Sequence, residues 1–328
     1  MKKMLFWFRN ARPTALPQSL LPAALALCMA SNVDGFSLSL GVIAVIGVVA
    51  VHLSMNLFDD YFDYKIKSAE YRDQMQHRGM RARISKCPYL KSGQATTSQL
   101  LVACMIFGGF ALAAGTVIYL FRGNMILLIA GLTALLGISY SGAPLRLSYH
   151  GLGEILIGIM FGPMLMAGVY YSACGTLDYS VFFISIPVGL LVANIVYTHS
   201  IMDFEPDREV GKRTLAVLLN NKKMMLACLL VLLLTAFGLV IGGVASGYLS
   251  VYHLFVLLLL PMAFGLFYLM IEFVRKPSRT FTPRFWMGYM GNWARFRSIG
   301  IDWFMIRWLI ARNLLSFFCL ILIIISLI

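Results

Sequence analysis

Long apolar runs divide this 328-residue chain, and short polar segments separate them. A helix needs about 20 mainly apolar residues to cross the hydrocarbon of a bilayer. Nine runs approach that length and predict an all-α protein with nine membrane-spanning helices, and no long flexible linker interrupts the series. We therefore expect a single domain over residues 1–328. The approximate spans are 16–34, 38–58, 98–121, 124–142, 152–172, 180–201, 224–246, 250–273 and 303–328.

The composition excludes a soluble protein. Hydrophobic residues make up 60% of the chain and charged residues only 12%, and the mean hydropathy is +0.81. A soluble globular protein carries about 25% charged residues. The apolar runs therefore belong to an integral membrane protein, in which lipid rather than water covers much of the surface.

The net charge of +13 comes mainly from the polar segments between the apolar runs. If the N-terminus is cytoplasmic, the cytoplasmic segments hold twenty-four of the twenty-seven Lys and Arg residues. Positive residues concentrate on the cytoplasmic side of membrane proteins, so we expect a multi-pass protein of the inner (cytoplasmic) membrane with a cytoplasmic N-terminus. Orientation and contact with anionic membrane lipids account for the charge. No recognised nucleic-acid motif is present, so we expect no nucleic-acid partner.

Half of the acidic residues lie in two short clusters. Residues 56–63 (Asn-Leu-Phe-Asp-Asp-Tyr-Phe-Asp) and 203–209 (Asp-Phe-Glu-Pro-Asp-Arg-Glu) hold seven of the fourteen Asp and Glu residues. Each cluster directly follows a predicted span, and in the predicted topology both face the cytoplasm. Carboxylates beside hydrocarbon are costly to keep ionised and usually serve a metal or a transported ion. The two clusters are therefore the predicted functional site.

Helical spacing gives each cluster a common face. Residues three or four apart lie on the same side of a helix, so Asn56, Asp60 and Asp63 would present one amide and two carboxylates together. Asp203 and Asp207 would do likewise if the helix continues past the intervening proline. Magnesium prefers oxygen ligands and is commonly held by one or two carboxylates together with phosphate oxygens. Two such faces at the mouth of a helix bundle could therefore hold magnesium around a diphosphate.

Other charged residues lie near these faces. Asp59 and Glu205 are off the shared faces and either support the ligands indirectly or are simply solvated. Glu154, near the start of the fifth span, either caps that helix or faces the cavity. Cations near the clusters would neutralise the outer phosphate oxygens. They are Lys65, Arg146, Arg208, Lys212 and Arg213.

Five segments together resemble the UbiA superfamily of membrane prenyltransferases, and within it most closely the 1,4-dihydroxy-2-naphthoate prenyltransferases of menaquinone biosynthesis. They follow the family order from residue 12 to residue 217, and the last is the most specific. The nine predicted spans also agree with the family. The segments are Arg12-Pro13-Thr14-Ala15-Leu16-Pro17, the 56–63 cluster with its Asp60-Tyr61-x-Asp63 core, Tyr140-Ser141-Gly142-Ala143-Pro144, Gly151-Leu152-Gly153-Glu154, and Asp203-x-x-x-Asp207-Arg208-Glu209-x-Gly211-Lys212-x-Thr214-Leu215-Ala216-Val217.

The resemblance implies a magnesium-dependent enzyme that moves a polyprenyl group from its diphosphate to an aromatic acceptor. It also implies a helix bundle around a central cavity that opens to the cytoplasmic side. The implied metal ligands are Asn56, Asp60, Asp63, Asp203 and Asp207, and the four aspartates are the implied catalytic residues. The implied substrate contacts are Asn56, Tyr140, Arg146, His199 and Lys212, with Arg146 and Lys212 on the diphosphate. An aromatic face such as that of Tyr140 could stabilise the allylic cation.

Several positions depart from the naphthoate pattern. His199 and Ser200 stand where paired Asn residues are usual, Asp59 replaces a common Asn, and His150 replaces a basic residue. His199, one turn before Asp203, is an acceptor-side base, a neighbour of the metal or a packed histidine, and histidine titrates near neutral pH. These departures keep 4-hydroxybenzoate, a tetrapyrrole and a lipid open as alternative acceptors. A secondary transporter is a further alternative, although transporters place their charges near the bilayer midplane.

Overall fold

A computed structural model describes residues 2–65, 87–209, 211–277 and 279–328 of the chain. Within these ranges the regular elements are helical, and the β pairing consists of one isolated bridge between His150 and Arg213. The prediction of an all-α membrane protein is confirmed. The basic residues of the segment 66–86, which the predicted topology places on the cytoplasmic side, lie outside the described residues.

Eight helical stretches of the described chain are long and apolar enough to cross a membrane. The stretches are α3 (Leu38–Lys65), α6 (Thr97–Arg122), α7 (Asn124–Ser141), the run α8–η3–α9 (Gly153–Ile159, Met160–Met164, Leu165–Cys174), α10 (Tyr179–Met202), α13 (Lys222–Ala245), the run η4–α14 (Val251–Leu259, Leu260–Arg275) and α16 (Asp302–Leu327).

The first predicted span is shorter than the sequence pattern suggested. Helix α2 covers Pro17–Ala30, only 14 residues, whereas about 20 are needed to cross the hydrocarbon. Residues 31–35 read Ser-Asn-Val-Asp-Gly, a composition that favours a turn over a helix. Among the described residues, eight helical stretches therefore have spanning length, and α2 is a shorter apolar helix that packs inside the bundle against α9 and α16.

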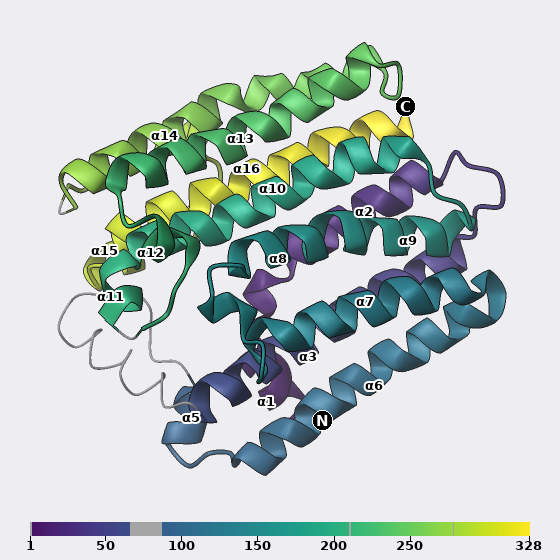
Figure 1. The fold of residues 1–328 in the computed structure, drawn as a ribbon, viewed down its shortest axis with the longest axis horizontal. Coiled ribbons are helices and arrows are strands. Elements are labelled where there is room, and N and C mark those ends of the chain that lie inside the picture. Colours follow the sequence, from purple (N-terminus) through teal and green to yellow (C-terminus); the bar gives the residue numbers. More distant parts are fainter. Residues whose placement is uncertain (1, 66–86, 210, 278) are drawn as a thin grey trace.

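The short elements lie near the ends of the long helices. Figure 1 shows the long helices side by side, with α5, α11, α12 and α15 gathered at the left end of the view. Of these, α5 lies in the connection after the first acidic cluster, and α11 and α12 lie in the connection that carries or follows the second. The bounds of the short elements are α1 (Lys2–Asn10), η1 (Pro13–Ala15), α5 (Pro88–Lys91), η2 (Leu147–Tyr149), α11 (Phe204–Glu209), α12 (Leu215–Leu219), η5 (Phe285–Met287) and α15 (Trp293–Ser298).

Helix α10 forms the centre of the bundle, and α7 lies at its edge. In the span of α10, 72% of the residues are buried, against 17% in the span of α7. Close approach of α10 to the α8–η3–α9 run depends on glycine, because a Cβ at Gly162 would lie 2.4 Å from the carbonyl oxygen of Ser185. The second acidic cluster therefore follows directly on the most enclosed helix. The exposed apolar side chains of α7 form a surface suited to lipid.

Polar residues fix where the spans begin. Thr96 and Gln99 form a reciprocal capping box at the start of α6, with the Gln99 amide donating to Thr96 Oγ1 at 3.2 Å. Asn221 Oδ1 accepts the backbone amides of Lys223 and Met224 at the start of α13. Such caps satisfy amides that have no partner within the helix. They therefore set the register of α6 and α13 relative to the connections that precede them.

Candidate functional site

The first acidic cluster lies on a helix that extends past the predicted span. The apolar pattern predicted an end at residue 58, but α3 continues to Lys65. Asn56, Asp60 and Asp63 therefore all lie on its last turns, as their spacing required. Asp60 and Asp63 are only 4% and 2% exposed. Two nearly buried carboxylates at the end of a spanning helix need nearby donors or cations.

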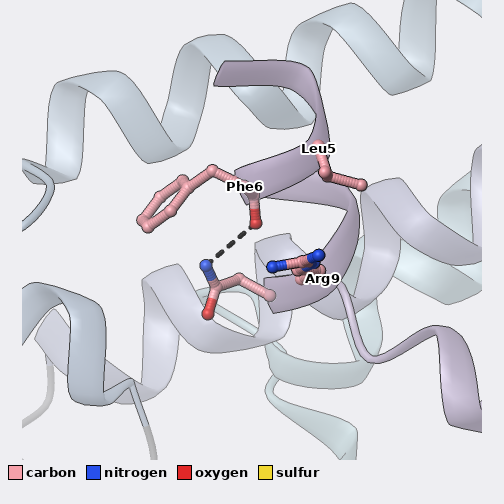
Figure 2. Close-up of a pocket in the computed structure, with 4 residues that line it drawn as sticks. Leu5, Phe6 and Arg9 are labelled. Carbon is pink, nitrogen blue, oxygen red and sulfur yellow. Dashed lines mark hydrogen bonds between the residues drawn. The ribbon is translucent and has the colours of Figure 1, made fainter. Parts of the chain in front are cut away.

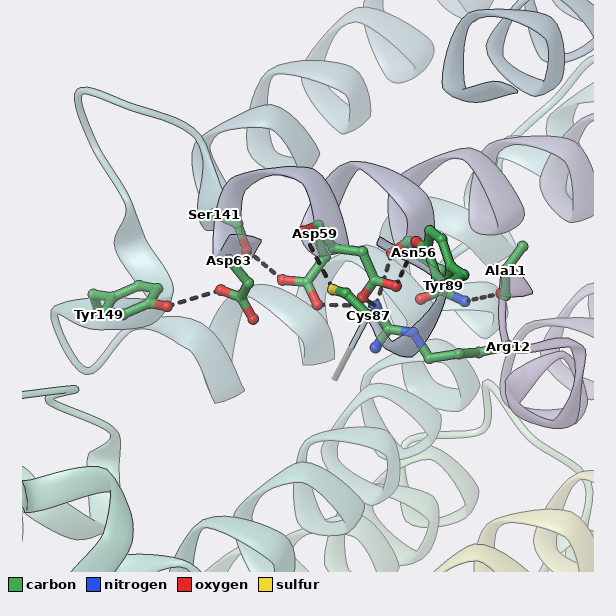
Figure 3. A network of polar contacts seen from close by, with 10 residues as sticks. Ala11, Arg12, Asn56, Asp59, Asp63, Cys87, Tyr89, Ser141 and Tyr149 are labelled. Carbon is green, nitrogen blue, oxygen red and sulfur yellow. Dashed lines mark hydrogen bonds and ion pairs between the residues drawn. The ribbon is translucent and has the colours of Figure 1, made fainter. Parts of the chain in front are cut away.

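Arg12 supplies a cation to this cluster. Its Nη2 donates to Asp60 Oδ1 at 2.7 Å, to Asp59 Oδ2 at 3.1 Å and to the carbonyl oxygen of Asn56 at 2.7 Å. Figure 3 shows Arg12 reaching the end of α3 from the segment that precedes α2. Burial opposes the charge of the guanidinium, but the carboxylates of Asp60 and Asp59 outweigh it and raise the pKa of Arg12. Arg12 therefore remains a cation wherever the protein is folded.

Tyr89 binds the other oxygen of the Asp60 carboxylate. Its hydroxyl donates to Asp60 Oδ2 at 3.0 Å, and its ring packs edge-on against Trp7 and Phe6 of α1. Burial, and then the negative charge of Asp60, raises the pKa of Tyr89. The phenol therefore stays protonated and continues to donate. Residues of α1, α5 and the Arg12 segment thus all help to position one carboxylate.

Two further hydroxyl groups bind the remaining carboxylates of the cluster. Ser141, at the end of α7, donates to Asp59 Oδ1 at 2.7 Å, and Tyr149 in η2 donates to Asp63 Oδ1 at 2.8 Å. Asp59 therefore lies inside the network. Of the two alternatives for this residue, indirect support of its neighbours fits the structure, and simple solvation does not.

The second acidic cluster keeps its helical spacing across a break. Helix α10 ends at Met202 and α11 begins at Phe204, but the amide of Asp207 donates to the carbonyl oxygen of Asp203 at 2.8 Å. The turn therefore continues through the proline, as the sequence analysis required. Asp203 and Asp207 are 1% and 3% exposed. Glu205, in contrast, forms an ion pair with Arg208 in which both side chains are about half exposed, so the solvated alternative holds for Glu205.

Tyr149 connects the two clusters. Its hydroxyl binds Asp63 of the first cluster, while Lys212 Nζ, just after the second cluster, lies 5.8 Å from the centre of its ring. The backbone joins the same segments, because the amide of Arg213 donates to the carbonyl oxygen of Tyr149 at 3.3 Å. The amide of Lys212 donates to the carbonyl oxygen of Asp207 at 2.9 Å. Lys212 therefore lies beside both clusters.

Arg146 and Tyr140 take positions next to this junction. Arg146 precedes η2 in a left-handed backbone conformation, and its half-buried guanidinium forms no hydrogen bond or ion pair with the described residues. Tyr140 lies near the start of α8, where a Cβ added at Gly153 would be 3.5 Å from its Cε2. Their roles toward a substrate stay predictions.

Glu154 caps a helix other than its own. It is 3% exposed, and its carboxylate accepts the hydroxyl of Ser200 at 2.7 Å and the amide of Leu215 at 3.3 and 3.4 Å. Leu215 is the first residue of α12, so the bond to its amide caps α12. Glu154 also lies in the first turn of α8, as one of its two predicted alternatives required, and its position toward a cavity stays a prediction. The carboxylate fastens the connection after the second cluster to α8 and α10.

His199 lies between the second cluster and α16. Its Nε2 is 3.5 Å from Asp203 Oδ2, and its ring meets the ring of Phe304 edge-on at 5.2 Å. This position combines two of the predicted alternatives, because the ring is packed and also neighbours a predicted metal ligand. Its role toward an acceptor stays a prediction.

Sequence reasoning missed four residues that hold the first cluster. Arg12 and Ser141 lie inside the segments that carry the family resemblance, and that position was a usable signal. Tyr89 and Tyr149 belong to connections with no helical spacing to the clusters, so the local pattern gave no signal for them. Their contacts depend on how the connections fold back.

The donor set fits magnesium. Asp60, Asp63, Asp203 and Asp207 offer hard oxygen ligands, and these are the ligands that magnesium prefers. Among the described residues no three His, Cys, Asp or Glu side chains are grouped closely enough to enclose a metal ion. A magnesium ion typically takes only one or two carboxylates and completes its shell with water and phosphate oxygens. The residues therefore suit magnesium bound together with a diphosphate better than a closed protein cage.

A hollow beside α1 lies apart from the carboxylates. Leu5, Phe6, Arg9 and Asn10 line it, and Asn10 Nδ2 donates to the carbonyl oxygen of Phe6 at 3.0 Å. Figure 2 shows Leu5, Phe6 and Arg9 projecting from the short helix. No residue of the acidic clusters lines this hollow. It therefore does not test the prediction of a central cavity.

Known proteins resemble this chain in sequence and in fold. The profile of the UbiA prenyltransferase family matches residues 19–292. The 1,4-dihydroxy-2-naphthoate octaprenyltransferase of Bacillus subtilis is 28% identical over 246 residues, which are 74% of this chain and 76% of that protein. The protein of the same name from Escherichia coli is 27% identical over 68% of this chain and 72% of its own length.

Solved structures share the arrangement of helices. A structure of digeranylgeranylglyceryl phosphate synthase matches with a TM-score of 0.65 at 16% identity, covering 100% of this chain and 99% of that one. A UbiA homolog from Archaeoglobus fulgidus bound to GPP and Mg2+ matches with a TM-score of 0.57 at 15% identity, covering 97% and 99%. These likenesses concern the fold, and the family profile covers most of the sequence. The chain therefore belongs to the UbiA prenyltransferase family.

Proposed function

We propose that this protein transfers a polyprenyl group from a polyprenyl diphosphate to an aromatic acceptor, with 1,4-dihydroxy-2-naphthoate as the leading candidate. One observation carries the proposal: each cluster holds a pair of nearly buried aspartates, and Tyr149 on Asp63 and Lys212 on Asp207 join the two clusters. The naphthoate octaprenyltransferases among the relatives support this acceptor class. The proposal includes a single catalytic domain and a cytoplasmic position for the N-terminus and both clusters, in the inner membrane.

The acidic clusters would hold the leaving group. In this proposal Asn56, Asp60 and Asp63 hold one magnesium ion, and Asp203 and Asp207 hold a second. Magnesium would stabilise the negative charge that develops on the departing diphosphate. Lys212 and Arg146 would bind the outer phosphate oxygens, since both are cations on the connections that border the clusters.

The transfer itself exchanges one bond for another. The bond between the allylic carbon and the diphosphate oxygen breaks, and its electron pair leaves with the diphosphate. A ring carbon of the acceptor supplies the electrons of the new carbon–carbon bond and then loses its proton or, in the naphthoate case, its carboxylate as carbon dioxide. Tyr140 would face the developing allylic cation. The apolar prenyl tail would lie between helices or extend into lipid.

The acceptor would lie near His199. This side chain contacts Asp203 and Phe304, so it borders the second cluster on the side of α16. Its neighbour Ser200 is already bonded to Glu154, which leaves His199 as the residue of this pair that could reach an acceptor. A different acceptor, such as 4-hydroxybenzoate, a tetrapyrrole or a lipid, would be recognised at the same place.

The proposal is tested with purified protein in lipid nanodiscs. The protein would be incubated with a polyprenyl diphosphate and a panel of acceptors, and the products identified by mass spectrometry. We expect a prenylated naphthoate product that requires Mg2+ and is reduced at least about 100-fold in Asp60→Ala and Asp207→Ala. Glu205→Ala is the matched control, because Glu205 lies in the same acidic sequence but pairs at the surface with Arg208. Transfer that persists in EDTA or in the two aspartate variants contradicts the mechanism, and a product from another acceptor alone corrects the substrate.

A further inference from the structure

The carboxylate of Asp60 is fully engaged by the protein itself. Arg12 Nη2 binds one oxygen at 2.7 Å, and the Tyr89 hydroxyl binds the other at 3.0 Å. Asp60 is 4% exposed, so water supplies little of its stabilisation. A buried carboxylate without a counter-charge is strongly unfavourable. Arg12 therefore gives the first cluster a cation before any metal is present.

Arg12 is itself incompletely bonded. All three of its hydrogen bonds to the first cluster use one nitrogen, Nη2. Its Nε is buried and has no hydrogen-bond partner among the described residues. A guanidinium prefers to donate through several of its N–H groups to a planar anion. The side chain is therefore poised to accept a further anionic partner, such as a phosphate group.

A metal ion on Asp60 would compete with this arrangement. A magnesium ion bound to either oxygen would lie close to the Arg12 guanidinium. Two cations at such a short distance repel each other strongly in a partly buried site. An anion of high charge between them removes the repulsion. A diphosphate supplies that charge, and the Nε of Arg12 supplies an additional donor for it.

We propose that Arg12 is the resident counter-ion of the first cluster, which disfavours binding of magnesium alone and makes metal binding depend on the diphosphate. This inference rests on the proposed function. When diphosphate and metal bind together, Arg12 would transfer its hydrogen bonds from Asp60 and Asp59 to phosphate oxygens, which would free these carboxylates to hold magnesium. The site then stays without metal until its substrate arrives. Arg12 acts as a positioning residue for the carboxylates and as a gate on metal affinity.

The test measures metal binding without catalysis. Mn2+ would be titrated into the purified protein in nanodiscs of phosphatidylcholine, with and without inorganic pyrophosphate, and free Mn2+ followed by electron paramagnetic resonance. The same titrations of empty nanodiscs subtract the Mn2+ that pyrophosphate itself chelates. We expect pyrophosphate to raise the Mn2+ affinity of the natural sequence by about tenfold or more. In Arg12→Gln we expect the affinity for Mn2+ alone to rise about tenfold, because the competing charge is removed. The effect of pyrophosphate should then shrink by a similar factor.

Three variants separate charge from other contributions. Arg12→Lys keeps the cation and should leave the affinity for Mn2+ alone within about twofold. Tyr89→Phe removes the other donor to Asp60 without changing charge, and should not raise that affinity. Arg9→Gln removes a cation of α1 that lines the hollow beside that helix, and it should behave like the natural sequence. If Arg12→Gln does not fold, the pyrophosphate effect on the natural sequence still decides, because equal Mn2+ binding with and without pyrophosphate overturns the inference.

Two results would overturn the inference. One is an unchanged or weaker affinity for Mn2+ alone in Arg12→Gln, and the other is equal Mn2+ binding by the natural sequence with and without pyrophosphate. The failure of the proposed function looks different, because no prenylated product would then form from any acceptor. A protein that makes product but shows either of the two metal-binding results retains the function and loses the inference.

Discussion

The two acidic clusters are organised by different kinds of contact. The contacts described for the second are local, since the amide of Asp207 donates to the carbonyl oxygen of Asp203 and His199 lies one turn earlier on the same helix. The first gathers side-chain donors from four segments that are distant in sequence. These donors are Arg12 before α2, Tyr89 in α5, Ser141 at the end of α7 and Tyr149 in η2.

The two clusters therefore illustrate two ways in which a protein can hold carboxylates in position. A cluster held by a continuing helix forms when that helix forms, and its geometry tolerates movement of the connections. A cluster held by distant donors forms only when the connections have folded back onto the helix end. The first cluster is therefore the one whose geometry can respond to the connections, and Tyr149 is the residue through which the response reaches Lys212.

Among the variants that test this comparison, those of Tyr149 should change the activity most. Tyr149→Phe loses the hydrogen bond to Asp63 but keeps a ring for Lys212, so we expect kcat/KM for prenyl transfer to fall about tenfold, as for a hydrogen bond to a charged group. Tyr149→Leu loses the ring as well and should fall about 100-fold, because the cation–π contact is also removed. Steady-state kinetics with both substrates varied measures this difference. Equal loss in the two variants would show that the ring contact with Lys212 contributes nothing.

Variants of Glu154 test whether the second cluster also depends on a contact between residues that are distant in sequence. Glu154→Leu leaves the Ser200 hydroxyl and the Leu215 amide without their buried acceptor, and we expect the free energy of unfolding to fall by about 2 kcal/mol. Glu154→Gln keeps an acceptor oxygen and should lose about half as much. Denaturant unfolding in detergent, followed by tryptophan fluorescence, measures both. If Glu154→Leu also abolishes transfer while remaining folded, α12 and its connection hold the second cluster as firmly as distant donors hold the first.

Sequence patterns predicted the features that depend on local spacing. They missed the contacts that form when distant segments fold back against the first acidic cluster. Spacing of three and four correctly placed Asp60 and Asp63 on one helix, because α3 continues through the cluster. The contacts of Tyr89 and Tyr149 join residues that are 29 and 86 positions from their aspartates, and no periodicity records such distances. Hydropathy alone overestimated the first span, since it did not weigh the turn composition of residues 31–35 against the apolar residues before them.

Asp59 gives the smallest expected effect and the finest test of the comparison. It lies within the first cluster but off the shared face of the predicted ligands, where it accepts from Arg12 and from Ser141. Asp59→Asn keeps an oxygen for the Ser141 hydroxyl, and Asp60 continues to hold Arg12, so we expect kcat/KM to change by no more than about threefold. Ser141→Ala should have an effect of the same size, because it removes one hydrogen bond from a carboxylate that keeps Arg12.

Kinetics of the double variant Asp59→Asn/Ser141→Ala then shows whether Asp59 only orients its neighbours or itself binds metal or diphosphate. If Asp59 only orients its neighbours, the double variant should lose little more than either single variant, since both substitutions act through the side chain at position 59. A loss of about 100-fold in Asp59→Asn alone would instead place Asp59 among the groups that bind metal or diphosphate. In that case the first cluster would use three carboxylates against the two of the second, and the contrast between the clusters would extend from how they are held to what they bind.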